Sequence, residues 1–172
     1  IGPHAVVGAG VVLGERVRLG VGVVLENGVE IGADSDLGPY VVCYSGTRVG
    51  QRCVFKAGVV LGGAGFGYIS GSLGHVRIPH VGGCLIGDDV ELGANSCVDR
   101  GSIGDTIIGA GTKLDNHVHI GHNARLGSHC LVMGGSVVAG SADIGDRVIM
   151  AGHAAVAGHF RVGHRVRIGA KA

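Results

Sequence analysis

The chain has 172 residues, and 36 of them are glycine, against a typical usage of about 7%. Tryptophan is absent and only 3% of residues are aromatic, although 46% are hydrophobic, so the large side chains that fill an ordinary layered core are missing. With 16% charged residues and three prolines, the composition excludes a disordered chain and a collagen.

No run of 18 apolar residues is present, so we expect no transmembrane segment. No secretory signal precedes the first repeat, although the sequence begins at Ile1 without methionine. Five cysteines without a CxxC pair favour a reducing compartment over a disulfide framework or a zinc ribbon. We therefore predict a cytoplasmic protein, with no metal site and no nucleic-acid partner.

The net charge of +1 is unevenly distributed. Residues 1–46 hold five acidic residues and two arginines, a balance of −3, whereas residues 147–172 hold five basic residues and no acid, a balance of +5. A positive end on a nearly neutral body suggests an anionic partner at that end. A solvated basic terminus would explain the same charges, and charge alone does not separate the two interpretations.

A hydrophobic residue recurs every six positions along most of the chain. In 16 of these 25 cases the next residue is glycine, and four places on stands a small or β-branched residue, with Phe160 as the conspicuous exception. On a helix of 3.6 residues per turn, side chains six positions apart would point to different sides of the helix. The repeat therefore predicts short strands joined by tight turns. The periodic residues are Ile1, Val7, Leu13, Leu19, Leu25, Ile31, Leu37, Cys43, Val49, Phe55, Leu61, then Ile86, Leu92, Val98, then Ile108, Leu114, Ile120, Leu126, Val132, Val138, Ile144, Met150, Val156, Val162 and Ile168.

Three such hexads close a triangular coil of 18 residues, with glycine easing the corners. Coils then stack with parallel strand pairing at about 4.8 Å per coil, which gives about eight coils. The sequence thus predicts an all-β fold, a parallel β-helix shaped as a triangular prism, in one domain over residues 1–172.

Two segments interrupt the repeat. Residues 62–85 form a long excursion that holds Phe66 and Tyr68 among many glycines, and we interpret it as a functional loop because long excursions from rigid scaffolds usually are. It is not a phosphate-binding GxGxxG loop, since no helix is expected after it. Further on, the step from Val98 to Ile108 is ten residues instead of twelve, so one coil is shortened.

His122 is the strongest candidate for chemistry from the residues alone. Its place in the coil predicts an outward side chain, and the residues one and two coils further along the same column are Gly140 and Gly158. Glycines beside a histidine leave an open slot and expose backbone N–H groups. His159 stands two coils from Asn123, so an acceptor lying across the slot could meet both imidazoles. A solvated or interfacial histidine is the plain alternative for His122.

Two other chemistries fit less well. His117 and His119 could grip a metal, as in the trimeric β-helices of the gamma-class carbonic anhydrases, but the position where those enzymes hold a further histidine is Gly127 here. A cysteine nucleophile is not predicted, because Cys43, Cys53 and Cys130 fall on inward positions and Cys84 and Cys97 have no evident activating base.

Four segments, taken together, resemble the UDP-3-O-acylglucosamine N-acyltransferases of lipid A synthesis. They are GGAGFGY (62–68), IGDDVELGANSCVDRGSIGDTIIG (86–109), LDNHVHIGHN (114–123) and VAGHFRVG (156–163). The resemblance covers the central hexapeptide-repeat domain of that family. It implies a left-handed β-helix, a homotrimer with active sites in grooves between subunits, and no permanently bound cofactor.

The resemblance also implies an activity and its residues. The family moves a 3-hydroxyacyl group from the phosphopantetheine of acyl carrier protein to the 2-amine of a UDP-sugar. By residue match, His122 is the general base, His159 orients the substrate, and the Gly140 N–H is an oxyanion donor. Asn116 and, more weakly, Asp115 lie on the substrate-facing wall. The basic residues 147–172 would meet the acidic carrier protein.

The chain departs from that family at both ends. The family carries an N-terminal uridine-binding domain and C-terminal helices, whereas this sequence starts and stops within the repeat. Two other functions therefore stay open: a hexapeptide acyltransferase with another amine acceptor or an acetyl-CoA donor, and a non-catalytic trimeric scaffold. A panel of donors would separate the two enzymes, and absence of any turnover would indicate the scaffold.

Overall fold

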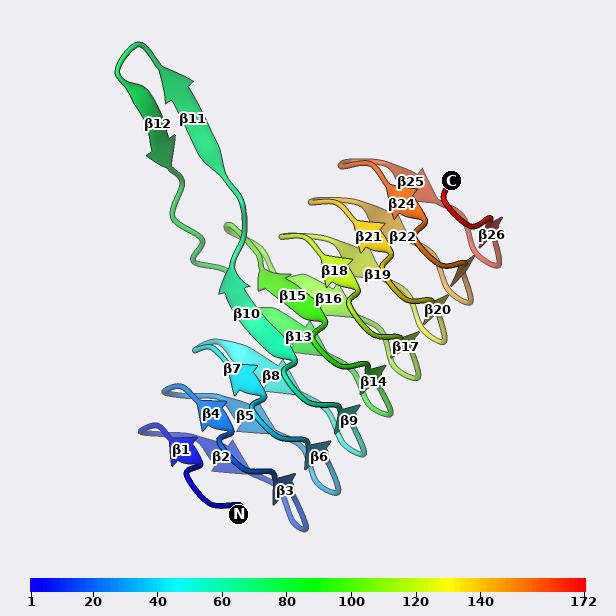
Figure 1. The fold of residues 1–172 in the computed structure, drawn as a ribbon. Coiled ribbons are helices and arrows are strands. Elements are labelled where there is room, and N and C mark those ends of the chain that lie inside the picture. The colour runs from blue at the N-terminus through cyan, green and yellow to red at the C-terminus, as the bar shows by residue number, and fades with distance from the viewer.

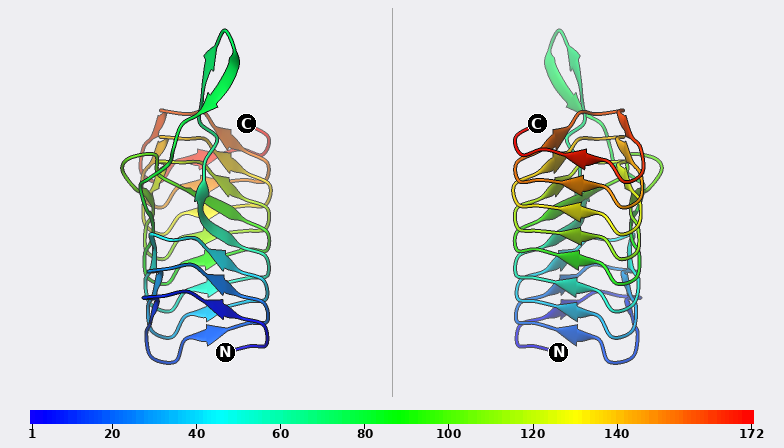
Figure 2. Two further views of the ribbon diagram at one scale, coloured as in Figure 1. Left: turned by 90° about the vertical axis from the view of Figure 1, so that its left-hand side faces the viewer. Right: turned by 90° about the vertical axis from the view of Figure 1, so that its right-hand side faces the viewer.

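The computed structural model describes residues 1–172 as a parallel β-solenoid with three flat faces and one projecting hairpin (Figure 1). The chain runs along the prism from one end to the other, so that the termini lie at opposite ends (Figure 2). The structure contains no helix, and hence none that could span a membrane. The predicted all-β prism is confirmed.

Each face is a sheet of eight parallel strands. The first sheet holds β1 (Val6–Val7), β4 (Val24–Leu25), β7 (Val42–Cys43), β10 (Val60–Ala64), β15 (Cys97–Arg100), β18 (His119–Ile120), β21 (Val137–Val138) and β24 (Ala155–Val156). The second sheet holds β2 (Val12–Leu13), β5 (Glu30–Ile31), β8 (Thr47–Val49), β13 (Cys84–Ile86), β16 (Thr106–Ile108), β19 (Arg125–Leu126), β22 (Asp143–Ile144) and β25 (Arg161–Val162). The third sheet holds β3 (Arg18–Leu19), β6 (Asp36–Leu37), β9 (Val54–Phe55), β14 (Glu91–Leu92), β17 (Lys113–Leu114), β20 (Leu131–Val132), β23 (Ile149–Met150) and β26 (Arg167–Ile168).

The core is a single column of 33 buried apolar residues along the prism axis. Both predicted inward series contribute to it: the periodic residues such as Ile120, and the residues four places later such as Ala124. Phe160, the exception noted in the sequence, is 64% exposed. Small side chains are required because three sheets converge on one narrow axis, which explains a hydrophobic chain with few aromatics.

The glycines that follow the periodic residues allow the coils to stack closely, whereas we had expected them to supply the backbone conformation of the corners. A Cβ on Gly2 would lie 2.6 Å from the Gly20 carbonyl carbon, so the glycine after the periodic residue permits close stacking of coils. The left-handed backbone falls two residues later, for example at His117 and Asn123 with φ of 57° and 60°. The coil geometry imposes this conformation on side chains of many types.

We name the edges of the prism by the sheets they join: the first corner joins the first and second sheets, the second corner joins the second and third, and the third corner leads back to the first. The excursion leaves from the first corner. It is shorter than the predicted 62–85, because β10 continues to Ala64 and β13 resumes at Cys84. Between them β11 (Tyr68–Gly71) and β12 (Gly74–Arg77) form an antiparallel hairpin that projects from the prism (Figure 1).

The outward side chains differ between the faces. On the second and third faces they include charged residues paired across coils, as in Glu30 with Arg48 at 3.3 Å and Glu91 with Lys113 at 2.6 Å, together with apolar residues such as Ile107 and Ile149. On the first face the column is apolar except for one histidine. Its members are Val6, Val24, Val42, Val60, Cys97, His119, Val137 and Ala155.

Candidate active site

The two interruptions of the repeat lie against each other at the first corner. The end of the excursion pairs with the short loop of residues 101–105, where the Val81 N–H donates to the Ser102 carbonyl at 2.9 Å and the Gly82 N–H donates to the Gly101 carbonyl at 2.9 Å. The next coil places His122 directly beside this junction, at the corner from which the hairpin projects.

The His122 ring is held in one tautomer by Asn123. The Ser102 N–H and hydroxyl both donate to Asn123 Oδ1, at 2.9 and 2.8 Å, and Asn123 Nδ2 donates to the Gly104 carbonyl at 3.0 Å. These bonds fix Oδ1 as an acceptor, and His122 Nδ1 lies 3.1 Å from it. In the neutral imidazole Nδ1 therefore carries the hydrogen and Nε2 carries the lone pair.

Gly140 provides the open slot beside that lone pair. A Cβ at this position would lie 2.8 Å from His122 Nε2, so any larger residue would displace the ring. In several other coils the corner N–H equivalent to that of Gly140 is capped by a side chain of the next coil, as when the Ala94 N–H donates to Asn116 Oδ1. The next residue in the Gly140 column is Gly158, which has no side chain, so the Gly140 N–H keeps no partner.

His80, from the end of the excursion, packs against His122 from the other side. The two ring centroids are 5.0 Å apart at an interplanar angle of 75°. His80 is buried, and its Nδ1 donates to the Ile78 carbonyl at 3.0 Å, while Nε2 has no partner. Sequence reasoning missed this residue, because a lone histidine in an irregular loop carries no periodic signal.

Asp99 is the second site residue that the sequence did not reveal. Its carboxylate lies 3.7 Å from His119 Nε2, and a Cβ on Gly65 would lie 2.8 Å from His122 Cβ and 3.2 Å from Asp99 Oδ2, so only glycine fits between the two residues. Burial raises the pKa of Asp99 above its ordinary value, an effect that the imidazoles of His119, His122 and His80 partly oppose. A carboxylate among three imidazoles favours positive charge there.

This electrostatic arrangement predicts a stability cost. An acid whose pKa is higher in the folded state binds its proton more tightly there, so its contribution is favourable at low pH and is lost as the pH rises through the folded pKa. Asp99→Asn should therefore raise Tm at neutral pH and leave less change at acidic pH. Thermal unfolding followed by circular dichroism from acidic to neutral pH measures this. Asp36→Asn on the exposed third face is the control, and a larger gain at low pH would contradict the assignment.

The hairpin and His122 enclose a groove of about 610 Å³. Its walls are aromatic and polar, which suits a ligand with an apolar chain and a polar head. Its outer wall comes entirely from the excursion, which supports the interpretation of that segment as functional. The lining residues are Phe66, Gly67, Tyr68, Ser70, His75, Ile78 and His122.

The other predicted site residues occupy two different corners. His159 lies at the first corner with His122, two coils on, and its N–H donates to the Gly140 carbonyl at 3.2 Å. Asn116 and Asp115 lie at the third corner, where they cap backbone N–H groups of neighbouring coils. Within one chain, Asn116 and Asp115 lie along one edge of the first face, whereas His122 lies along the opposite edge.

The cysteines are structural. Cys43, Cys53, Cys84 and Cys130 are buried as free thiols, and burial raises the pKa of Cys84 to about 12. Such thiols are weak nucleophiles at neutral pH, in agreement with the sequence-based interpretation.

Comparison with known proteins identifies the fold class. Residues 105–140 match the family described as bacterial transferase hexapeptide (six repeats), and residues 28–62 match the hexapeptide repeat of succinyl-transferase. The solved UDP-N-acetylglucosamine acyltransferase of Francisella novicida superimposes with a TM-score of 0.86 at 22% identity, over 98% of this chain and 63% of its own. The protein is thus a left-handed β-helix of the hexapeptide-repeat class.

Within this class the sequence is homologous to the UDP-3-O-acylglucosamine N-acyltransferases. The Coxiella burnetii protein of that name is 43% identical over 160 residues, which covers 82% of this chain and 47% of the relative. UDP-3-O-acylglucosamine N-acyltransferase 1 of Gloeobacter violaceus is 52% identical over 100 residues, covering 58% of this chain and 29% of the relative. The resemblance noted in the sequence is confirmed, and the chain spans less than half the length of these relatives.

Proposed function

We propose that this chain carries the acyl-transfer centre of an N-acyltransferase, with His122 as the general base. One observation carries the proposal: His122 Nε2, oriented by the Asn123 contact of Nδ1, lies beside Gly140, a residue without a side chain whose N–H has no partner. A base and a neutral N–H donor next to each other are the two groups that attack of an amine on a thioester requires.

The reaction then proceeds by addition and elimination. The amine nitrogen bonds to the thioester carbonyl carbon and passes a proton to His122 Nε2, while the carbonyl oxygen becomes an oxyanion that accepts a hydrogen bond from the Gly140 N–H. The intermediate collapses by breaking the carbon–sulfur bond, and the leaving thiolate takes the proton from His122. The negative field of Asp99 stabilises the imidazolium in between.

The substrates follow from the homologous enzymes. We propose the 2-amine of a UDP-3-O-acylglucosamine as the acceptor and a 3-hydroxyacyl group on the phosphopantetheine of acyl carrier protein as the donor, in the cytoplasm and in lipid A synthesis. The chain needs no resident cofactor for this chemistry, because the donor brings its own activated thioester. His159 is positioned further along the same corner, where it would orient the bound substrate.

The apolar first face supports a proposed homotrimer. Eight outward positions on that face include one polar residue, His119, whereas the other two faces carry charge pairs. A continuous apolar face of this kind is an interface, and closed cyclic symmetry is the common solution for identical chains. We propose that three prisms meet with their first faces toward the threefold axis.

This arrangement explains the position of Asn116 and Asp115. Around a threefold axis the first corner of one protomer meets the third corner of the next. Asn116 and His122 belong to the same coil, on β17–β18 and β18–β19 connections, so Asn116 of the partner subunit would face His122 at the same height. The substrate-facing wall predicted for Asn116 and Asp115 is then supplied in trans.

A donor and acceptor panel tests the proposal directly. The protein is incubated with 3-hydroxyacyl carrier protein or acetyl-CoA, each with UDP-3-O-acylglucosamine or its 2-hydroxy analogue, and amide or ester formation is followed by mass spectrometry. We expect amide formation with the carrier-protein donor. Turnover only with acetyl-CoA would assign another hexapeptide acyltransferase, and no turnover with any pair would favour a scaffold.

A further inference from the structure

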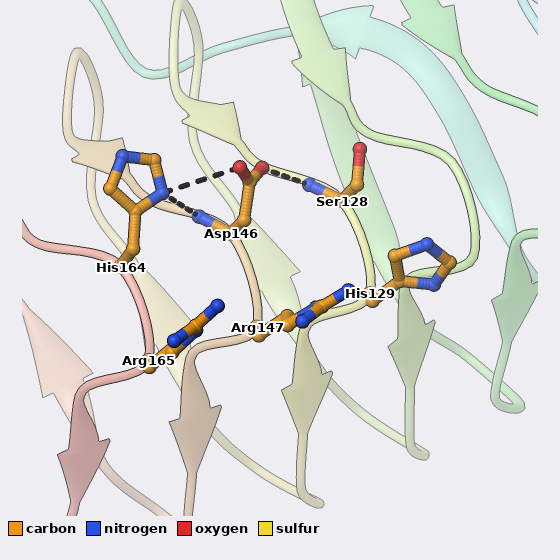
Figure 3. A pocket seen from close by; sticks show the side chains of 6 residues that line it. All are labelled: Ser128, His129, Asp146, Arg147, His164 and Arg165. Carbon is orange, nitrogen blue, oxygen red and sulfur yellow. Dashed lines mark hydrogen bonds and ion pairs between the residues drawn. The ribbon is translucent and has the colours of Figure 1, made fainter.

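A second concave site lies on the second corner, away from His122. It is a shallow groove of about 600 Å³ with no hydrophobic residue in its lining. His129, Arg147 and Arg165 occupy the same corner position in three successive coils, each in the left-handed conformation, and the two arginine side chains extend in the same direction (Figure 3). Successive coils are about 4.8 Å apart, so the three side chains form one continuous ladder.

The same corner is built differently in the N-terminal half of the prism. There the ladder alternates in sign, and each arginine makes two bonds to an acid of the next coil. Arg16 donates to both carboxylate oxygens of Asp34 at 2.6 and 2.8 Å, and Arg52 does the same with Asp89 at 2.7 and 2.8 Å. After Gly111 the alternation stops, and Arg147 and Arg165 have no acidic partner within 4.0 Å.

The one acid in the groove is already engaged. Asp146 Oδ1 accepts a hydrogen bond from the Ser128 N–H at 2.8 Å, and the Asp146 N–H donates to His164 Nδ1 at 2.9 Å. Asp146 therefore faces along the backbone of the corner and leaves the arginines uncompensated (Figure 3). Like charges stacked at ladder spacing repel each other, and a bound anion relieves that repulsion.

We infer that the groove formed by His129, Arg147 and Arg165 binds a phosphate group. Guanidinium forks match phosphate oxygens in geometry as well as charge, and a groove open on one side admits the end of a larger molecule. The site goes beyond the proposed acyl transfer, since it lies on a different corner from His122. It also offers a location for an anionic partner, one of the two interpretations of the +5 balance of residues 147–172.

Titration with inorganic phosphate tests the site. Binding is followed by NMR of the arginine Nε–H and histidine signals, and by the rise of Tm with phosphate concentration that ligation of the folded state produces. In the variant Arg147→Asn/Arg165→Asn we expect the dissociation constant to rise by about tenfold or more. Asparagine is chosen because it tolerates the left-handed backbone.

The matched control is Arg16→Asn, which removes an acid-paired arginine at the same corner and should leave phosphate binding unchanged. A second arm compares phosphate with pantetheine 4′-phosphate: tighter binding of the latter identifies the donor arm as the source of the group, and equal binding identifies simple phosphate. No binding by the unmodified chain, or equal binding by the double variant, overturns the proposal. Acyl transfer measured in parallel with the His122 site intact keeps this outcome separate from the proposed reaction.

Discussion

Replacing His122 with alanine is expected to lower kcat for amide formation by about 10²- to 10⁴-fold, the usual contribution of a positioned general base. Without the imidazole the attacking amine has no acceptor for its proton, because the Gly140 N–H beside it can only donate. The half-buried ring is not part of the apolar core column, so the prism should remain folded. Initial rates at saturating and limiting acceptor separate kcat from KM, and KM should change little.

The control for this experiment is His164→Ala. His164 holds the equivalent coil position on the second corner, and its ring accepts a hydrogen bond from the Asp146 N–H, so its removal tests the structural effect of losing a corner histidine. Both variants should elute at the same volume as the unmodified chain in size-exclusion chromatography. Unchanged turnover in His122→Ala would remove His122 from the mechanism, whereas equal losses in both variants would show that corner packing, and not proton transfer, was measured.

The periodic part of this fold could be predicted from sequence because a single rule decides each position. An aliphatic residue every six places fixes which side chains enter the axis, and the buried positions Ile120 and Ala124 follow from counting alone. The left-handed corner could not be predicted in the same way. It is occupied by residues as different as Tyr40, His117 and Lys171, so the stacking of coils and not the local sequence determines that conformation.

The same distinction, between regular coils and irregular segments, separates the site residues that could be predicted from those that could not. His122 and Gly140 were predicted because both belong to regular coils and share a column. His80 and Asp99 were missed because their contacts depend on the path of the excursion, which has no repeat to extrapolate. The role of Asn123 was missed for a related reason: its side chain is oriented by Ser102, in the shortened coil, 21 residues away in sequence.

Gly140→Ala is expected to reduce kcat by about 10²- to 10³-fold, comparable to the loss of an oxyanion donor elsewhere. The added methyl would lie 2.8 Å from His122 Nε2 and 2.9 Å from Cε1, closer than carbon atoms approach ring atoms without displacement. One substitution thus affects both the general base and the oxyanion donor. It pushes the ring away from the orientation that Asn123 sets, and it narrows the slot through which a thioester oxygen reaches the Gly140 N–H.

The choice of control decides how this result is interpreted. Gly163→Ala places a methyl where the nearest atom, on the Val166 side chain, is 4.0 Å away, at the second corner and away from His122, so its activity and Tm should match the unmodified chain. Gly140→Ala should retain Tm to within a few degrees, because the crowded partner is a side chain at the surface that can rotate, and not the backbone of the next coil. A variant that lost activity only in proportion to a loss of folded protein would show that Gly140 is required for stacking. A variant that is folded and assembled like the unmodified chain but inactive would show that Gly140 is required for the reaction, because the space beside His122 Nε2 is then needed by the substrate and not by the fold.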